Sequence, residues 1–281
     1  MRSVFSAGLL DRFLGEDFNP FDFYIGVSAG ASNLAAFLSG VPRKSLEIYL
    51  DLALRREFIS YRRFLLGGHL IDLDWLFATA FSRDLLDIPA IFALGKPLYV
   101  GVTDVASGRA EYVRAAPDNL AGIIKASTAL PLFYRGFPRV HGRPMTDGGV
   151  ADGIPAPQAI HLGAKRIMVV RSRSSSYRKK DTWMHRYIRW SLRKYVSLAT
   201  AMRERVECHE RVIELIRHPP PGVSIVDICP PDHFVVDRFS RDRDALVKGY
   251  RLGFEAGEEA MARWRDAESV VSLASDSVGN L

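Results

Sequence analysis

A short apolar run that leads into a small-residue helix constrains this chain more than any other feature. Residues 21–27 are mostly apolar and run into Gly26-Val27-Ser28-Ala29-Gly30, and residues 30–38 then follow a small-residue helical pattern. A G-x-S-x-G sequence at a strand-to-helix turn is typical of the nucleophile elbow of serine hydrolases. The helix would direct free N–H groups and its positive dipole end toward Ser28. The N–H of Ala29 is then the natural first oxyanion donor.

Strand-like and helical patterns alternate along most of the chain. This alternation predicts an α/β fold with three layers, in which a mostly parallel central sheet is flanked by helices. Residues 58–94 have the pattern of short helices and loops, as in a cap, and residues 142–149 are rich in turns. The expected strands are 21–27, 97–103, 110–113, 166–170 and 223–228, and the expected helices are 4–13, 30–38, 43–54, 120–127, 157–162, 183–217 (one helix or a pair) and 242–264.

Composition narrows the class of protein. The 281 residues are 48% hydrophobic, which is ample for a sizeable core. No segment has the length and apolar character of a membrane-spanning helix, and the N-terminus lacks a signal-peptide pattern, so we expect a cytoplasmic protein. Cys208 and Cys229 are the two cysteines, which excludes a disulfide framework and a thiolate metal cluster. We expect no metal.

Positive charge is concentrated in one segment. The net charge is +6, but residues 166–211 contain thirteen Lys or Arg against four Asp or Glu, so the rest of the chain is slightly acidic. Such a segment favours an anionic partner, such as phospholipid headgroups, for one face. No nucleic-acid-binding motif accompanies it, and we expect no nucleic-acid partner.

A basic aromatic stretch, residues 183–195, lies within that segment. Trp183, Tyr187 and Trp190 are spaced to share one helix face, with several cations nearby. One interpretation is an interfacial helix that makes peripheral membrane contact, with aromatics at headgroup depth and cations on anionic lipid. The other, which we favour from the sequence, is a helix that packs its aromatic stripe on the core.

A nucleophilic serine needs a base, because its hydroxyl is scarcely ionised near neutral pH. In a triad with the chain order Ser, Asp, His, a later histidine would serve. None of the candidates lies in a glycine-flanked loop of obvious design. They are His161, His185, His209, His218 and His233.

A carboxylate acting directly is the second possibility. Asp147-Gly148-Gly149 precedes Asp152-Gly153-Ile154-Pro155. The glycines permit a turn that presses the Asp147 carboxylate against another segment, and partial burial would raise its pKa and make it a better base. An ordinary Asp-Gly turn fits the same residues, so this segment alone leaves the choice open.

Three motifs taken together indicate a family. Gly26-Val27-Ser28-Ala29-Gly30 is followed by Ala126-Ser127-Thr128-Ala129-Leu130-Pro131, and then by Asp147-Gly148-Gly149 with Asp152 and Ile154-Pro155. In order and spacing these segments resemble the patatin-like phospholipases, over roughly residues 1–170. The match is specific because three motifs agree in order, and it looks like the bacterial branch of the family.

The resemblance implies a fold, a reaction and a set of residues. It implies a serine esterase that hydrolyses acyl esters of lipids through a Ser-Asp dyad without histidine or any cofactor. Ser28 would attack the ester carbonyl, Asp147 would accept its proton, and water would release the fatty acid from an acyl-enzyme. We expect residues 1–170 to form the catalytic region, 171–265 to complete it or be appended to it, and 266–281 to form a flexible tail. The residues expected for oxyanion and substrate binding are Ala29, Arg2, Gly26, Gly30, Gly148 and Gly149.

One departure from the family pattern concerns the oxyanion hole. Family members begin with a strand and a glycine-rich loop that ends in Arg or Lys, and Arg2 would match that basic residue. Loss of one oxyanion donor in a comparable hydrolase costs about 3–4 kcal/mol. We therefore expect either that the printed start is late, which we favour, or that the protein is a weakened relative. In the second case it would act as a lipid-binding or interaction module.

Overall fold

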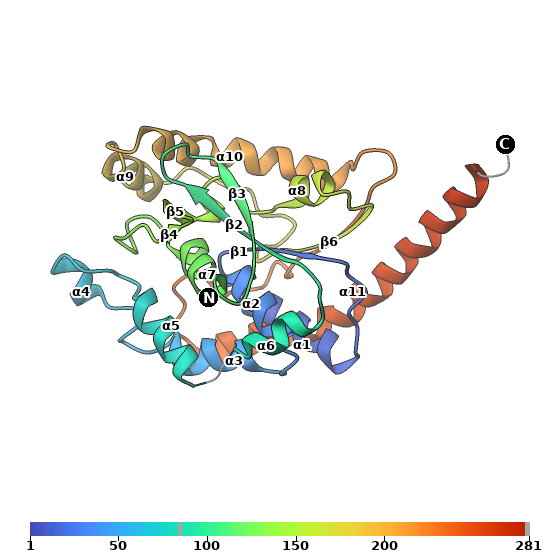
Figure 1. Ribbon diagram of the computed structural model, residues 1–281, viewed down its shortest axis with the longest axis horizontal. Coiled ribbons are helices and arrows are strands. Elements are labelled where there is room, and N and C mark those ends of the chain that lie inside the picture. The colour runs from blue at the N-terminus through green and yellow to red at the C-terminus, as the bar shows by residue number, and fades with distance from the viewer. Residues whose placement is uncertain (84–85, 279–281) are drawn as a thin grey trace.

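A computed structural model of the protein describes residues 1–83 and 86–278, and its strands form a central layer between two layers of helices (Figure 1). Helices α8, α9 and α10 lie on one side, and α1, α2, α3, α6 and α11 lie on the other. The predicted α/β class, with a central sheet between helices, is confirmed. The helices on the first side are α8 (Ala156–His161), α9 (Trp183–Ser191) and α10 (Val196–Arg217).

The other helices follow the sequence-based expectation with shifts at their ends. The expected helix at 43–54 is divided into α3 and a π-helical segment, η1, and the expected helix at 183–217 is a pair. The region 58–94 holds three short helices, as predicted. The remaining helices are α1 (Val4–Gly15), α2 (Ala29–Leu38), α3 (Lys44–Glu47), η1 (Ile48–Leu52), α4 (Tyr61–Leu65), α5 (Leu73–Ser82), α6 (Ile88–Ala93), α7 (Leu120–Thr128), η2 (Gly148–Val150) and α11 (Arg243–Val278).

Helix α11 continues to Val278, beyond the end at residue 264 that the sequence predicted. Its first half packs closely against α1, where two glycines permit the contact. A Cβ atom on Gly8 would lie 2.0 Å from the Tyr250 carbonyl oxygen, and one on Gly253 would lie 1.9 Å from the Phe5 carbonyl oxygen. The flexibility expected for residues 266–281 stays a prediction, and residues 279–281 lie outside the described part of the chain.

The strands form a mixed sheet and a separate parallel pair. In the five-stranded sheet, β1 pairs with β2 in parallel, whereas β3 and β5 pair with β2, and β4 with β5, in antiparallel orientation. The sheet is therefore not mostly parallel as predicted, because short turns join β2 to β3 and β4 to β5, and such hairpins are antiparallel. The strands are β1 (Tyr24–Val27), β2 (Leu98–Asp104), β3 (Ala110–Arg114), β4 (Arg139–Val140), β5 (Arg143–Asp147), β6 (Arg166–Val170) and β7 (Ser224–Ile228), the last two forming the parallel pair.

The register of β2 brings the ends of β1 and β5 together. Strand β3 pairs with residues 99–103 along one edge of β2, so β1 and β5 must share the other edge. Val27 at the end of β1 pairs with Gly101, and Asp147 at the end of β5 pairs with Val102. The two strands therefore approach each other end to end and meet at adjacent residues of β2.

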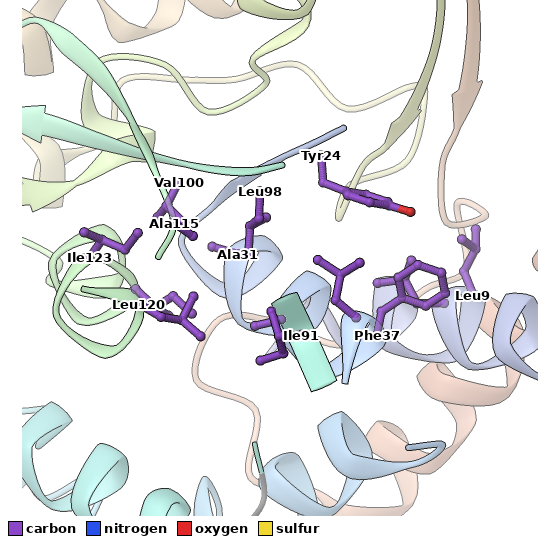
Figure 2. Close-up of a cluster of buried hydrophobic side chains, with 14 of the residues drawn as sticks. Leu9, Tyr24, Ala31, Phe37, Ile91, Leu98, Val100, Ala115, Leu120 and Ile123 are labelled. Carbon is purple, nitrogen blue, oxygen red and sulfur yellow. The ribbon is translucent and has the colours of Figure 1, made fainter. Parts of the chain in front are cut away.

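The main hydrophobic core lies between the sheet and the layer that contains α1 and α2. Figure 2 shows side chains from both meeting there, with Leu98 of β2 and Phe37 of α2 among the labelled residues. Leu9 and Leu98 are at most 1% exposed. Burial of a leucine of this kind contributes about 1.5–3 kcal/mol, so this packing fixes α2, and with it the residue at its N-terminus, against the sheet. No helix in the described residues is both long enough and apolar enough to cross a bilayer.

Candidate active site

Ser28 occupies a strained turn between β1 and α2. Its backbone has φ +53° and ψ −131°, a conformation that non-glycine residues rarely adopt. Gly26 makes the tight turn possible, since a Cβ atom there would lie 2.5 Å from the Cα atom of Ala31. The turn therefore has the strained geometry that the sequence predicted for a nucleophile elbow.

The Ser28 hydroxyl donates a hydrogen bond to Asp147, with 2.7 Å between Oγ and Oδ2. The other carboxylate oxygen of Asp147, Oδ1, accepts a hydrogen bond of 2.7 Å from the backbone N–H of Gly149. Both oxygens are thus fixed, and Asp147 is only 3% exposed. The two residues are 119 positions apart in the chain and meet because β1 and β5 end at adjacent residues of β2.

The backbone of Asp147 is also held in place. Its N–H donates to the carbonyl of Ala129 at 3.0 Å, and its carbonyl accepts a 2.9 Å hydrogen bond from the Thr103 hydroxyl. Burial raises the pKa of the Asp147 carboxyl, against the opposing effect of the Ser28 hydrogen bond. Such a carboxylate is a stronger proton acceptor than an exposed one.

Ser127 holds the turn from the other side and was missed as a site residue. Its hydroxyl accepts a 2.7 Å hydrogen bond from the backbone N–H of Ser28 and donates one of 2.6 Å to the carbonyl of Gly101. The side chain is fully buried. Ser127 belongs to the motif Ala126–Pro131, on which the family resemblance partly rests, but the sequence alone does not indicate what its hydroxyl does.

The residues expected for oxyanion and substrate binding fall into two groups, those that face the cavity and those that hold Asp147 in place. Ala29 and Gly30 begin α2, so their N–H groups precede the first intrahelical hydrogen bonds, and both line the cavity beside Ser28. A Cβ atom on Gly30 would meet nothing within 4 Å. Gly148, in contrast, is buried against Gly101, where a Cβ would lie 2.2 Å from the carbonyl oxygen, and its neighbour Gly149 uses its N–H on Asp147. These two glycines position the carboxylate.

The five candidate histidines are not in hydrogen-bond contact with Ser28 or Asp147 in the described residues. His185 and His209 line the same cavity, and burial lowers the pKa of each to about 4, so both are neutral near pH 7. His185 bonds to Thr182 at the start of α9. Asp152, the other acid of the third motif, accepts a 2.5 Å hydrogen bond from the Tyr112 hydroxyl instead of approaching Ser28.

A cavity of about 1910 Å³ opens beside Ser28 and Asp147. It is larger than the roughly 300–1,000 Å³ of ordinary small-molecule pockets. Residues of both β1 and β6 line it, as do apolar side chains from residues 58–94, for which the sequence predicts a cap. The apolar side chains from that region are Phe58, Ile59, Ile71, Leu73, Leu76 and Phe77.

Cations gather on the wall of this cavity. Arg2 lies just before α1, Lys179 precedes α9, Arg205 lies on α10 and Arg238 precedes α11. Burial and the charges of Arg205 and Arg238 lower the pKa of Lys179 to about 7. Burial likewise lowers the pKa of Arg2, which forms a long ion pair of 3.8 Å with the exposed Asp237. The cavity therefore combines one buried acid with several cations.

The basic aromatic stretch forms α9 and the turn that follows it. Trp183 and Trp190 are 68% and 59% exposed, and Tyr187 is also exposed, whereas Ile188 and Leu192 are buried. The favoured prediction that the aromatic stripe packs on the core is wrong, because these aliphatic side chains take that place. No group of three or more His, Cys, Asp or Glu in the described residues is arranged to hold a metal ion.

A strained serine at a strand-to-helix turn, hydrogen-bonded to a buried carboxylate in an α/β fold, has the arrangement of a serine acyl-hydrolase site. Residues 1–160 match the family model described as patatin-like phospholipase, and the chain belongs to that family. Residues 195–268 match a second model, a domain of unknown function (DUF6363). The uncharacterized protein YjjU of Escherichia coli strain K12 is 35% identical over 268 residues, which cover 93% of this chain and 74% of that protein.

Proposed function

We propose that the protein hydrolyses acyl esters of lipids, with Ser28 as nucleophile and Asp147 as general base. The observation that carries this proposal is the 2.7 Å hydrogen bond from Ser28 Oγ to a buried carboxylate whose pKa is raised. Membership of the patatin-like phospholipase family supports a lipid substrate. The apolar side chains from the 58–92 region give the cavity a surface on which an acyl chain can lie.

The chemistry proceeds in two halves through an acyl-enzyme. Asp147 accepts the proton of the Ser28 hydroxyl while Oγ attacks the ester carbonyl, and the N–H of Ala29 donates to the oxyanion that forms. Collapse breaks the ester bond, and Asp147 returns the proton to the leaving alcohol. In the second half Asp147 takes a proton from water, hydroxide attacks the acyl group, and the proton passes to Ser28 as the fatty acid leaves.

Labelling with a fluorophosphonate probe tests the assignment. We expect wild type to label and Ser28→Ala and Asp147→Asn each to lose about a thousandfold or more in labelling rate, because they act as one unit. Matched controls are Ser32→Ala, one turn along α2, and Asp22→Asn, an exposed acid on the cavity wall; both should label like wild type. Undiminished labelling of folded Ser28→Ala would refute the nucleophile.

We further propose that α9 makes a peripheral membrane contact. Its exposed Trp183 and Trp190 have exposed cations beside them, which suits headgroup-depth aromatics on an anionic surface. In co-sedimentation with phosphatidylglycerol vesicles, the Trp183→Ala/Trp190→Ala double variant should bind several-fold more weakly than wild type. Val235→Ala, which removes part of another exposed apolar side chain, is the control. Equal binding of all three proteins would contradict the contact. A cytoplasmic location stays a prediction.

A non-catalytic lipid-binding protein of the same fold is the rival function. It is distinguished by the two experiments together, because it predicts vesicle binding without any labelling of Ser28. The buried, fully hydrogen-bonded Asp147 favours the hydrolase, since burial of a carboxylate without use for it would only cost stability.

A further inference from the structure

Two adjacent leucines at the end of α4 are the most exposed large apolar side chains in the described residues. Leu65 is 85% exposed and Leu66 is 79% exposed. Tyr61, one turn earlier on the same helix, is exposed as well, and we call these three residues the leucine tip. Helix α4 projects from the body of the protein at one end of its longest axis (Figure 1). Single exposed apolar side chains are ordinary, but a group of them on a projecting turn indicates a contact surface.

Hydrogen bonds hold the backbone of the leucine tip in position. The Ser60 hydroxyl caps α4 by accepting a 3.2 Å hydrogen bond from the N–H of Arg63. Arg135, from a distant segment, donates to the carbonyl of Phe64 at 3.1 Å and lies over its ring. The exposure of the leucines is therefore a property of a fixed turn. The Arg63 guanidinium ties both sides of this turn together by donating at 2.8–3.4 Å to the carbonyls of Glu57, Phe58, His69 and Leu70.

Positive charge accompanies the leucine tip. Residues 55–69 contain four arginines against one acid, Glu57. Arg55, Arg56 and Arg62 are exposed. An apolar turn with cations beside it fits an anionic lipid surface, where leucines enter the acyl boundary and arginines stay with the headgroups. A second copy of this chain would bring its own cations against these, which disfavours self-association through the tip.

A few residues of chain join the leucine tip to the cavity wall. Phe58 and Ile59 precede the tip, Ile71 and Leu73 follow it, and all four line the cavity. Helix α9 lies toward the same end of the longest axis as α4, opposite to the C-terminal end of α11 (Figure 1). Two exposed apolar elements with cations beside them therefore lie toward one end of the molecule.

We propose that the leucine tip inserts into an anionic bilayer and docks this end of the protein on the lipid, with the adjoining apolar part of the cavity wall close to the surface. This insertion is a second membrane contact, separate from that of α9, and it does not depend on catalysis. Its consequence, that docking admits membrane esters to Ser28, rests on the proposed hydrolase function.

Co-sedimentation with vesicles of diether phosphatidylglycerol tests the insertion, because these lipids contain no ester to cleave. We expect Leu65→Ala/Leu66→Ala to bind about tenfold more weakly than wild type, since it brings less apolar surface into the bilayer. The control variant, Leu94→Ala/Val235→Ala, removes exposed apolar surface from other parts of the molecule and should bind like wild type. Equal binding of the two double variants would overturn the insertion, whether or not the protein is a hydrolase.

High salt distinguishes insertion from attraction between charges. At about 1 M salt the Debye length is about 3 Å, so all variants should bind more weakly, but the ratio of wild type to Leu65→Ala/Leu66→Ala should persist. A ratio that falls to one would overturn the insertion. Sedimentation of the free proteins tests the other occupant. A wild-type dimer that the leucine variant dissociates, with unchanged vesicle binding, would make the tip an interface between copies and overturn the proposal.

A pair of substrates tests the consequence for catalysis. Leu65→Ala/Leu66→Ala should hydrolyse soluble p-nitrophenyl butyrate with the kcat/KM of wild type, and dioleoyl phosphatidylglycerol in vesicles about tenfold more slowly. Loss on both substrates would mean that the tip supports the active site, and it would overturn the docking role. Tip-dependent binding to diether vesicles without hydrolysis of either substrate by wild type would refute the hydrolase and leave the insertion standing.

Discussion

The two walls of the cavity differ in how completely their polar groups are satisfied. On the wall where β1 and β5 end, Ser28 and Asp147 bond to each other, and Ser127 of α7 and backbone groups behind them complete the hydrogen bonds, at 2.6–2.7 Å. On the wall that carries Arg205, the buried Nε atoms of Arg205 and Arg173 have no hydrogen-bond partner in the described residues. Hydrogen bonds within the protein therefore hold the polar groups of the first wall in position before any ligand binds, whereas the two Nε atoms of the second wall lack such partners.

The first prediction tests how much the wall that carries Ser28 and Asp147 depends on its glycines. Gly26→Ala should lower the free energy of unfolding by about 1–3 kcal/mol, because the new Cβ would lie 2.5 Å from the Cα atom of Ala31. Gly30→Ala, in the same motif, has open space and should be neutral or stabilising by about 0.5 kcal/mol. Urea unfolding compares the two. Equal losses would mean that the turn is not limited by this contact.

The second prediction concerns Ser127. Ser127→Ala leaves the Ser28 N–H and the Gly101 carbonyl without their partner, so the free energy of unfolding should fall by about 2 kcal/mol, and the fluorophosphonate labelling rate should fall with it. Thr128→Ala is the control, because among the described residues the Thr128 hydroxyl bonds only to carbonyls of its own helix. A wild-type labelling rate in Ser127→Ala would show that the turn keeps its geometry unaided.

The third prediction follows from the raised pKa of Asp147. The folded protein holds this proton more tightly than the unfolded chain, so stability is fully present below the ordinary Asp pKa and decreases as pH rises through the raised one. The slope is at most about 1.4 kcal/mol per pH unit. Because an asparagine does not titrate, the Asp147→Asn variant lacks this decrease in stability. The free energy of unfolding of the variant relative to wild type should therefore increase with pH over that window.

Urea unfolding of both proteins across a pH series measures the difference between their free energies of unfolding. The pH-dependent contributions of Asp11 and Asp152, whose pKa values are also raised, are common to both proteins and cancel in this difference. Labelling of wild type should increase over the same window, because the base must be ionised. A stability difference that is constant with pH would contradict the raised pKa.

The smallest expected change in the free energy of unfolding comes from the wall that carries Arg205. Arg205→Met removes a half-buried charge whose Nε has no hydrogen-bond partner in the described residues, and the free energy of unfolding should increase by about 0.5–2 kcal/mol. Arg203→Met, which changes an exposed charge on the same helix, should stay within about 0.5 kcal/mol of wild type. A loss of stability in Arg205→Met would mean that this arginine supports the fold.

Local sequence predicted the elements of the site better than it predicted their surroundings. The strand-to-helix turn at Ser28 and the hairpin at 97–113 follow from short-range patterns, and both are present. The turn-rich segment 142–149 instead holds β5, the second strand of the hairpin with β4, followed by η2, because pairing with β2 and β4 overrides a weak local preference. The prediction that the aromatic stripe of α9 packs on the core was wrong for a different reason. Helical periodicity shows which residues share a face, but it does not show whether that face meets the core or solvent. The glycine-rich oxyanion loop expected ahead of Arg2 stays a prediction.

The sequence by itself determined the family and the position of Ser28 at a strand-to-helix turn, because each is encoded in short motifs, and through the resemblance to that family it predicted Asp147 as the base. Only the tertiary structure decided that Ser28 and Asp147 meet at 2.7 Å, that Ser127 locks the turn, and that cations from four distant segments share one cavity. The reason is that these contacts depend on strand register and on the packing of α10 over the sheet, which no local pattern specifies.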